Sequence, residues 1–473
     1  MIMVFSSLVF LCLFLPVVLI LHTVIPNRKV QNGLLLVASL LFYAYGEPVY
    51  VFLMLLSALC NYVFAWLLDK YQKKIFLVLA VVVNLGLLGV FKYTGFLLSN
   101  LNAVLGLNLP IPQISLPIGI SFFTFQALSY VIDVSRGQVA LQKNYGKLLL
   151  YISFFPQLIA GPIVRYKDVA REIDERTINP REAAFGMRRF IIGLAKKVLI
   201  ANAMGAAADY IFNHGAANIN VIGAWIGAIA YLMQIYYDFS AYSDMAIGLG
   251  WMFGFHFKEN FNQPYIASSI QDFWRRWHIS LSTFFRDYVY IPLGGNRKGK
   301  VRTVVNRIIV FFLTGLWHGA NWTFVIWGMF HGFFLLLEEF IPLIKKLPKF
   351  LRHIYTLLTV TVGFVIFRAD TIREAWLFIC QMFSGFDFSP AVTSYAVQAL
   401  TPYFIVMLLA AIVCCGPLEK HVQKLCVPKD KEDLTHRETV LLNTSFVLAC
   451  LLLVWCILRL AGGSYNPFIY FRF

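Results

Sequence analysis

The chain has 473 residues, of which 59% are hydrophobic and 14% are charged, and its formal net charge is +16. Soluble domains contain roughly a quarter charged residues, so this composition excludes an ordinary soluble protein. Several apolar runs approach the about 20 residues that a helix needs to cross a bilayer, which predicts an all-α polytopic membrane protein. Lys and Arg stand in short loops between these runs, which indicates the positive-inside arrangement and no nucleic-acid partner.

The first part of the chain predicts four membrane helices, at residues 4–25, 34–45, 49–67 and 75–91. The first lacks the basic segment and the small-residue cleavage site of a secretory signal, so we expect it to be retained. Basic residues follow the first and third helices but not the second, which places the N-terminus outside the cytoplasm. The stretch 94–116 contains two prolines and is expected to be a loop or a re-entrant piece.

The middle of the chain alternates apolar runs with two polar stretches. Helices, some of them short for a span, are expected at 117–134, 148–160, 190–208, 221–237 and 240–255. The stretch 165–189 carries both charge signs and fits a cytoplasmic amphipathic segment. The stretch 209–220 has no Lys or Arg, so we expect an external loop there.

Two apolar runs, 308–317 and 322–340, form a predicted hairpin between basic stretches. Nine Lys or Arg residues lie between Lys258 and Arg307, and four more follow the hairpin. Because both flanks are basic, the hairpin is predicted to enter from the cytoplasm. Its turn would then lie deep in the membrane or toward the outer face.

The last part of the chain predicts further helices at 353–367, 402–415 and 439–460, with a short interfacial piece at 375–383. The basic stretch 417–438 is expected in the cytoplasm, and the tail 461–473 outside it. We therefore predict one integral-membrane domain, residues 1–473, with an extracytoplasmic C-terminal tail.

His318 lies at the turn of the hairpin, after Trp317 and between Gly315 and Gly319. An ionisable side chain at that depth is costly to hold, so it is a candidate catalytic base. The alternative is a buried neutral imidazole that bonds a helix carbonyl. The glycines permit close helix approach and the tryptophans suit a ligand tunnel, which favours catalysis. His331, thirteen residues on, is expected to support or pack against the site.

Aromatic and cationic residues interleave between residues 273 and 287, around His278. Arg275, Arg276 and Arg286 fit two interpretations. They are either the snorkelling arginines of an interfacial helix or the arginines of a cytoplasmic mouth that binds phosphates.

Asp238 and Asp244 stand six residues apart in otherwise apolar sequence. The favoured interpretation is structural, with Asp238 as a helix cap or a buried hydrogen-bond partner near a helix break. The alternative is a proton path, an ion site or a substrate site.

Several motifs of other enzyme classes are missing from the sequence. It has no HExxH, GxSxG, Walker A or GxGxxG motif, which argues against metalloproteases, serine hydrolases and ATP-driven pumps. The eight cysteines lie mostly inside apolar runs without metal-ligand spacing, so neither a disulfide framework nor a metal site is expected.

The sequence resembles the membrane-bound O-acyltransferase (MBOAT) superfamily, and within it the alginate O-acetyltransferase-like branch. The matching stretches are residues 3–7, 234–248, 273–287, 288–296 and 316–322. The resemblance implies a helical bundle with a through-membrane tunnel and re-entrant or interfacial helices. It also implies that His318 is the catalytic histidine and that His278 is the earlier histidine of the family pattern.

The resemblance implies a function as well. The chain would transfer an acetyl group from cytoplasmic acetyl-CoA, with no permanently bound cofactor, across the bacterial cytoplasmic membrane. An extracytoplasmic SGNH-type acetyltransferase would receive it and modify a cell-envelope polysaccharide. Coenzyme A phosphates cannot readily cross lipid, so they would dock at the basic face near Arg275. Asn321 or Trp322 would stabilise the developing oxyanion.

The C-terminal residues 466–473 resemble the aromatic tail of the small partner protein in teichoic-acid D-alanylation. By that resemblance Tyr470 would carry the acyl group as an ester, after His318 activates its hydroxyl. The alternative is that the tail is an aromatic interface anchor.

Two other functions stay open at this point. D-alanyl transfer in teichoic-acid modification is one, although the built-in tail argues against a system with a separate tail protein. The other is a transporter or lipid flippase in which His318, Asp238 and Asp244 relay protons. The sequence does not identify the acceptor polymer.

Overall fold

The computed structural model describes residues 3–159, 161–416, 433–463, 465–467 and 469, and within these ranges it is built from helices, without strands. The chain divides into two compact units. Unit 1 comprises residues 1–190 and 243–258, and unit 2 comprises residues 191–242 and 259–473. Each unit is described by itself.

Unit 1 packs its helices around an aromatic core. Its helices are α1 (Leu15–Val24), α2 (Arg28–Gly46), α3 (Tyr50–Tyr71), α4 (Ile75–Leu88), α5 (Thr94–Leu105), α6 (Ile120–Ser135), α7 (Tyr145–Ser153), α8 (Phe155–Leu158) and α9 (Tyr166–Glu175). The rings of Phe10, Phe42 and Phe155 meet with centroids 5.7–6.2 Å apart. Asn61 of α3 and Asn84 of α4 exchange side-chain hydrogen bonds of 3.1 and 2.8 Å, which satisfies two buried amides between these helices.

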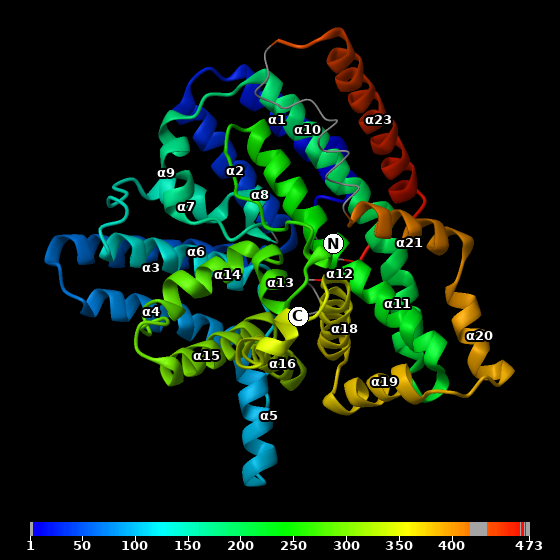
Figure 1. Ribbon diagram of the computed structural model, residues 1–473. Helices are drawn as coiled ribbons and strands as arrows, with labels where there is room; N and C mark the ends of the chain where they lie inside the picture. The colour runs from blue at the N-terminus through cyan, green and yellow to red at the C-terminus, as the bar shows by residue number, and fades with distance from the viewer. Residues whose placement is uncertain (1–2, 160, 417–432, 464, 468, 470–473) are drawn as a thin grey trace. The chain divides into compact units, whose positions relative to one another are not determined.

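Unit 2 holds the predicted hairpin. Its helices are α11 (Asn202–His214), α13 (Ile270–Arg276), α14 (Ile279–Phe285), α15 (Lys300–His318), α16 (Trp322–Phe340), α17 (Pro342–Lys346), α18 (Lys349–Arg368), α19 (Ile372–Ser384), α20 (Pro390–Ala399), α21 (Pro402–Cys414) and α23 (His436–Ala461). Two helices contribute to both units, α10 (Pro180–Ala195) and α12 (Val221–Met252). α16 packs against α15 and α18, and the three lie close together in Figure 1.

The prediction of a polytopic membrane protein is confirmed. Within the described residues, six helices are long and apolar enough to cross a membrane. They are Tyr50–Tyr71, Ile75–Leu105, Pro180–His214, Trp322–Phe340, Lys349–Arg368 and His436–Ala461. The pair α20 and α21, bent by 62°, makes a seventh if it counts as one broken span.

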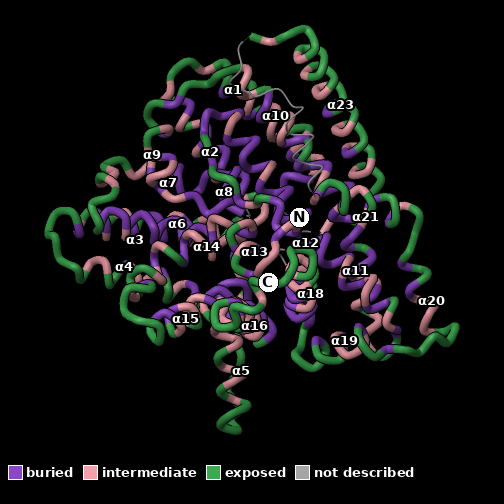
Figure 2. Tube along the Cα trace, viewed as in Figure 1, coloured by how far each residue is buried: buried purple, intermediate pink, exposed green. Residues whose placement is uncertain are grey.

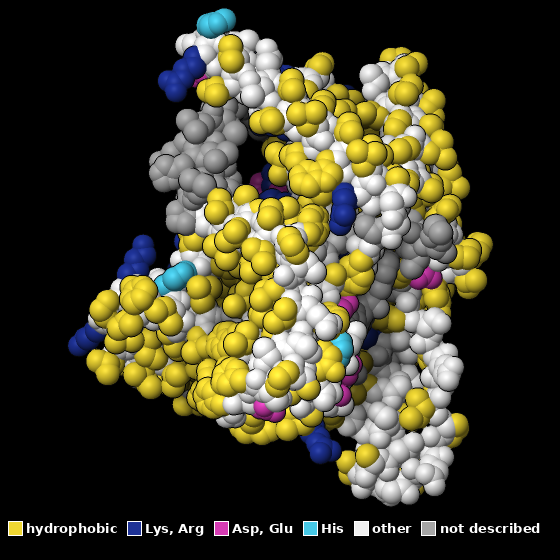
Figure 3. All heavy atoms as spheres, turned by 90° about the vertical axis from the view of Figure 1, so that its right-hand side faces the viewer, with side chains coloured by type: hydrophobic (Ala, Val, Ile, Leu, Met, Phe, Trp, Pro, Cys, Tyr) yellow, Lys and Arg dark blue, Asp and Glu magenta, His cyan; other side chains and the backbone are white. Residues whose placement is uncertain are grey.

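The apolar side chains on the outside of these helices fit a lipid environment. α23 is mostly exposed in Figure 2, and its Leu451 and Leu458 are among the large apolar residues open to the surroundings. Val406 and Leu409 of α21 are exposed as well. Figure 3 shows hydrophobic side chains over much of this face, with few charged groups among them. Exposing such an apolar surface to water would be unfavourable, whereas in a bilayer it contacts apolar lipid chains.

Glycines allow α15 and α16 to approach closely, as the sequence predicts. A Cβ atom at Gly315 would overlap the carbonyl oxygen of Phe324, and one at Gly328 would overlap that of Phe311. Small residues at helix crossings let the backbones pack directly against each other. This contact holds the hairpin whose turn carries His318.

Two expected interruptions are wrong because polar side chains bond within or across helices. The stretch 94–116, predicted as a loop or a re-entrant piece, begins with α5, which follows α4 through a π-helical segment, Gly89–Tyr93. Thr94 and Asn100 donate to the carbonyl oxygens four residues earlier, Val90 and Phe96, so they are accommodated in a helix.

The expected break near Asp238 is also wrong. α12 runs without interruption from Val221 to Met252, so Asp238 lies inside a helix and does not cap one. The external loop predicted from residue 209 begins only after His214, because α11 continues through Asp209. Both aspartates have cationic partners, which removes the need to end the helices.

Candidate active site

His318 is the last residue of α15, and the hairpin turn carries it into the interior of unit 2. Its side chain is only 4% exposed. Aromatic rings surround it, with centroid distances of 4.9 Å to Trp317, 5.0 Å to Trp327 and 5.2 Å to Phe367. The His318 ring is therefore enclosed by aromatic side chains of α15, α16 and α18.

The turn is held by Asn321, which is the N-cap of α16. Its side-chain oxygen accepts a 3.1 Å hydrogen bond from the backbone N–H of Thr323, and its amide donates to the carbonyl oxygen of Asp370 at 3.0 Å. The Asn321 side chain thus has a structural task in the turn. Trp322 is about half exposed. The oxyanion role of Asn321 or Trp322 stays a prediction.

His278 is the second buried histidine of the site. It lies between α13 and α14, and its ring centroid is 6.3 Å from that of His318 and 5.7 Å from that of Trp317. Trp317 stands 39 positions after His278 in the sequence. The fold of unit 2 brings the two rings together. Burial lowers the pKa of His278 to about 3, so its imidazole is neutral at physiological pH.

The backbone at His278 is strained. Its φ of +46° lies in the left-handed region, which residues other than glycine adopt at a cost. Asn260 maintains this conformation: its carbonyl oxygen accepts the Ile279 N–H at 2.9 Å, and its side-chain oxygen accepts the Ser280 N–H at 3.0 Å. Asn260 is itself buried, so this clamp is rigidly held.

His331 lies further along α16 and packs against two tryptophans. Its ring lies 5.2 Å from Trp327 and 5.4 Å from Trp274, centroid to centroid. Trp327 therefore stands between His331 and His318. Gly363 of α18 makes room for this ring, since a Cβ there would come 2.9 Å from the His331 Nε2 atom.

A buried carboxylate orients α13. Glu338 of α16 accepts hydrogen bonds from the backbone N–H groups of Ile270, at 2.6 Å, and Gln271, at 3.2 Å. These are N-terminal N–H groups of the helix, where a negative charge is favourable. The cap fixes the direction of α13 and hence the positions of Trp274 and His278 beyond it.

The three candidate phosphate-binding arginines differ in availability. Arg276 pairs with Asp272 at 2.9 Å, and Arg286 pairs with Asp287 at 2.7 Å. Arg275 is exposed. All three flank the His278 motif, but two of the three cations are already matched by carboxylates.

Asp238 and Asp244 each have a cationic partner inside their own unit. Asp238 pairs with Lys197 at 2.7 Å, within unit 2. Asp244 pairs with Arg189 at 2.8 Å, within unit 1. These ion pairs give both carboxylates structural partners.

Tyr470 lies outside the described residues, so the structure does not test the predicted carrier. Among the described residues, no three His, Cys, Asp or Glu side chains gather as metal ligands would.

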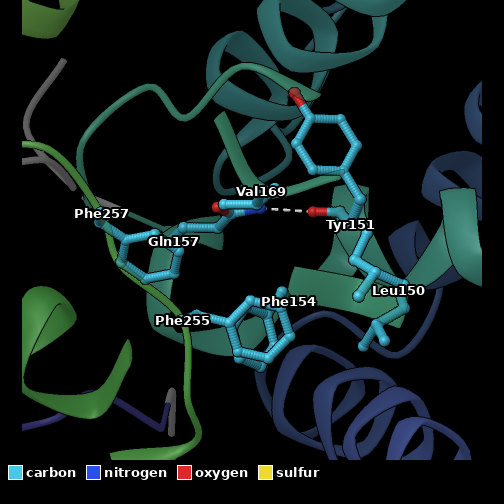
Figure 4. Close-up of a pocket in the computed structure, with 8 residues that line it drawn as sticks. Leu150, Tyr151, Phe154, Gln157, Val169, Phe255 and Phe257 are labelled. Atoms are coloured by element: carbon cyan, nitrogen blue, oxygen red, sulfur yellow. Dashed lines mark hydrogen bonds between the residues drawn. The ribbon is translucent and has the colours of Figure 1, made fainter. Parts of the chain in front are cut away.

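Each unit contains a cavity. One, in unit 1, holds about 10 Å³ and is walled by Phe154, Phe255 and Phe257, with the amide of Gln157 donating to the carbonyl oxygen of Tyr151 (Figure 4). That volume suits at most a water molecule, which excludes it as an acyl-donor site. The other, of about 260 Å³, lies in unit 2 between α11, α20, α21 and Tyr465.

Sequence reasoning missed Asn260, Glu338 and Lys197. Asn260 and Glu338 carry no local signal, because their partners are backbone groups distant along the chain. Lys197 was detectable: it stands beside Lys196 in the apolar run 190–208, and a cation inside such a run requires a partner such as Asp238.

The sequence was compared with known proteins. The membrane-bound O-acyltransferase family pattern matches residues 33–380. The chain is 41% identical to the probable alginate O-acetylase AlgI of Azotobacter vinelandii, over the full length of both chains. It is 37% identical to a peptidoglycan O-acetyltransferase of Helicobacter pylori, over 79% of this chain and 78% of that one. It is 31% identical to a teichoic acid D-alanyltransferase of Bacillus subtilis, over 52% and 65%.

Proposed function

The chain belongs to the membrane-bound O-acyltransferase family, and we propose that it uses His318 to move an acetyl group from cytoplasmic acetyl-CoA toward an extracytoplasmic cell-envelope polysaccharide. The O-acyltransferase class follows from the family and from its O-acetyltransferase relatives. The observation that carries the residue assignment is the buried pair of His318 and His278, 6.3 Å apart inside an aromatic cluster.

In this mechanism His318 is the general base. It takes the proton from the attacking hydroxyl as that oxygen adds to the thioester carbonyl. Collapse of the tetrahedral intermediate forms the ester and breaks the carbon–sulfur bond, and the imidazolium returns the proton to the departing thiolate. His278, whose ring lies 6.3 Å from that of His318, centroid to centroid, would act beside the base as a second hydrogen-bonding group.

Donor binding would use the basic stretch that contains Arg275. The guanidinium of Arg275 is exposed, whereas Arg276 and Arg286 are paired and would have to exchange their carboxylates for phosphates. The proposal therefore assigns Arg275 the first contact with coenzyme A. The basic residues on both flanks of the hairpin support a cytoplasmic location for this face in the proposal.

The acyl acceptor in the proposal is Tyr470, in a tail on the outer side of the bacterial cytoplasmic membrane, where the N-terminus also lies. A phenol with a pKa of about 10 requires a base at neutral pH, and His318 would supply it. An SGNH-type partner would then move the acetyl group from the tyrosine ester to the polysaccharide. The family match runs through residues of both units, which supports one catalytic domain.

The test is acetyl transfer from radiolabelled acetyl-CoA by purified protein in nanodiscs. His318→Gln keeps the size and polarity of the side chain but removes the base, and we expect about 10²- to 10⁴-fold slower thioester cleavage with a near-normal melting temperature. His436→Gln, at an exposed histidine, is the matched control. Full activity of His318→Gln would exclude His318 as the base.

The carrier step has its own measurement. Mass spectrometry of trapped protein should find an added acetyl group on the C-terminal peptide, and Tyr470→Phe should abolish it. A labelled sugar acceptor without a labelled peptide would instead mean that His318 activates the sugar hydroxyl directly.

The match to a teichoic acid D-alanyltransferase makes D-alanyl transfer the second candidate. The two functions differ in donor, since one uses acetyl-CoA and the other a D-alanyl thioester. Offering both donors to the same preparation separates them. The family membership does not favour a transporter.

A further inference from the structure

Lys197 and Asp238 form an ion pair in the interior of unit 2. Lys197 lies in a π-helical segment, Lys196–Ala201, and Asp238 lies inside α12. Their side-chain atoms are 2.7 Å apart and their side chains are 2% and 0% exposed. Removing both charges from water carries a large desolvation cost, so the pair needs further hydrogen bonds to be stable.

The additional hydrogen bonds come from the end of the chain. The Lys197 ammonium donates to the carbonyl oxygen of Pro467, and the Ile469 N–H donates to the Asp238 carboxylate at 3.2 Å. Both partners of the pair therefore bind backbone groups of the same short segment, on either side of one residue. Backbone contacts of this kind fix the register of a segment independently of its side chains.

Two further contacts hold the residues just before this point. Asn202 donates from its amide to the side-chain oxygen of Asn466 at 3.1 Å. The Tyr465 hydroxyl donates to Asp209, whose other carboxylate oxygen pairs with Arg368 at 2.6 Å. The second ion pair thus anchors the segment as the first one does.

Gly205 of α11 provides the space for this arrangement. A Cβ at Gly205 would come 2.7 Å from the Gln234 amide nitrogen and 3.2 Å from the Tyr465 ring. Any larger residue would push the tyrosine away from Asp209. Tyr465 also forms one wall of the 260 Å³ cavity, so the docked segment shapes that cavity.

We propose that the Lys197–Asp238 and Arg368–Asp209 pairs form a docking site for the C-terminal segment, defined here as Tyr465, Asn466, Pro467 and Ile469, and that Lys197 and Asp238 are positioning residues for the acyl carrier. Docking itself stands on the contacts above. Its catalytic meaning rests on the proposed function, in which the next residue, Tyr470, carries the acetyl group.

A structural role alone makes a different prediction. If the pair only braces the π-helical segment against α12, replacing both charges by apolar residues should restore stability and leave the C-terminal segment as well held as before. If the pair is a docking site, the double replacement restores stability but the segment stays released. The variants Lys197→Met, Asp238→Leu and the double variant separate these cases.

The experiment measures chymotryptic cleavage of the C-terminal segment by mass spectrometry, on full-length protein in nanodiscs, together with the melting temperature. Each lost charge-assisted hydrogen bond should speed cleavage about tenfold or more, so we expect at least that for the double variant at near-normal melting temperature. Lys196→Met, at the neighbouring lysine, is the control and should cleave at the wild-type rate. Wild-type protection in the double variant would overturn the proposal.

Two additional readouts keep docking apart from the proposed function. Tyr465→Phe removes one hydroxyl and should speed cleavage less than the double variant does. The acetyl adduct on the C-terminal peptide should fall in the double variant in proportion to its release. If the wild-type segment is protected but carries no acetyl adduct, the carrier role is disproved and docking is unaffected. If the wild-type segment is cleaved as fast as that of the double variant, docking is disproved, whether or not an acetyl adduct is found.

Discussion

Two regions of the molecule place histidines in opposite surroundings. In unit 2, His278, His318 and His331 are buried among aromatic rings. In unit 1, His256 is partly exposed and lies between two carboxylates, with its ring nitrogens 2.7 Å from Glu172 and 2.9 Å from Glu182.

The difference shows how environment sets the charge of one residue type. Burial lowers the pKa of His278, whereas hydrogen bonding to Glu172 and then to Glu182 raises the pKa of His256. A neutral, dry imidazole can accept a proton from a substrate. An imidazole held by two carboxylates is suited to joining helices, and His256 joins α9 to α10 within unit 1.

The largest effect on the aromatic region should come from crowding the hairpin. Gly328→Ala would force a Cβ against the Phe311 carbonyl oxygen and should cost about 1–3 kcal/mol, because a packed crossing cannot absorb an extra methyl group. The melting temperature in detergent measures this loss of stability. Acetyl transfer should also become slower, because His318 would move. Gly86→Ala is the control, since nothing lies within 4 Å of its Cβ position. Equal melting of the two variants would contradict the close packing.

The lowered pKa of His278 predicts how stability depends on acidity. Because the unfolded state binds the proton near pH 6.5 and the folded state only near pH 3, stability is fully present above about pH 6.5 and is lost as pH falls through this window. The loss approaches about 1.4 kcal/mol per pH unit for one such group. The melting temperature should therefore change less between pH 7.5 and pH 4.5 in His278→Gln than in the wild type. The exposed control His436→Gln should retain the wild-type slope, and an unchanged slope in His278→Gln would show that His278 is accessible to protons.

The clamp on His278 gives a smaller effect. Asn260→Ala removes the acceptor for the Ser280 N–H and hydroxyl, both within 3.0 Å, and should cost about 0.5–2 kcal/mol. We expect a lower kcat with little change in KM, because His278 leaves its strained conformation. Asn260→Asp, which keeps an acceptor oxygen, should recover part of the rate, and exposed Asn262→Ala should have no effect. A normal kcat in Asn260→Ala would show that the hydrogen bonds of Asn260 are not needed for catalysis.

The smallest effect belongs to His256. Since its pKa is raised, its contribution is fully present below about pH 6.5 and is lost as pH rises through the folded value. Because His256 is exposed to solvent, its contribution to the free energy of unfolding should be below about 1 kcal/mol. Hydrogen exchange at the His256 N–H, which donates to Glu172 at 3.0 Å, should become faster at pH 8.5 than at pH 6 after correction for the intrinsic rate. His256→Gln should remove this difference, and a reversed trend would mean that burial outweighs the carboxylates.

Local patterns were sufficient for the hairpin and for most membrane helices. The apolar runs 308–317 and 322–340 lie within α15 and α16, and the glycines near His318 make the close contacts expected of them. Periodicity and glycine spacing are properties of adjacent turns, so they can be read from neighbouring residues. The polytopic class and the family were likewise predicted correctly.

Polar residues inside apolar runs were interpreted less well. Asp209 and Asp238 read locally as helix ends, yet both lie within helices because Arg368 and Lys197 neutralise them. These partners stand 159 and 41 residues away in the chain, and no local pattern connects them. The catalytic role of His318 and the carrier role of Tyr470 stay predictions.

By itself, the sequence determined that this chain is a helical membrane protein of the acyltransferase family and that its hairpin presents a histidine, because hydrophobicity and motif spacing are written in consecutive residues. Only the tertiary structure decided that His278 joins His318 in one aromatic cluster, that Asn260 holds His278 in place, and that a buried ion pair binds the C-terminal segment. The reason is physical: burial and charge pairing depend on which distant residues the fold brings within a few ångströms of each other.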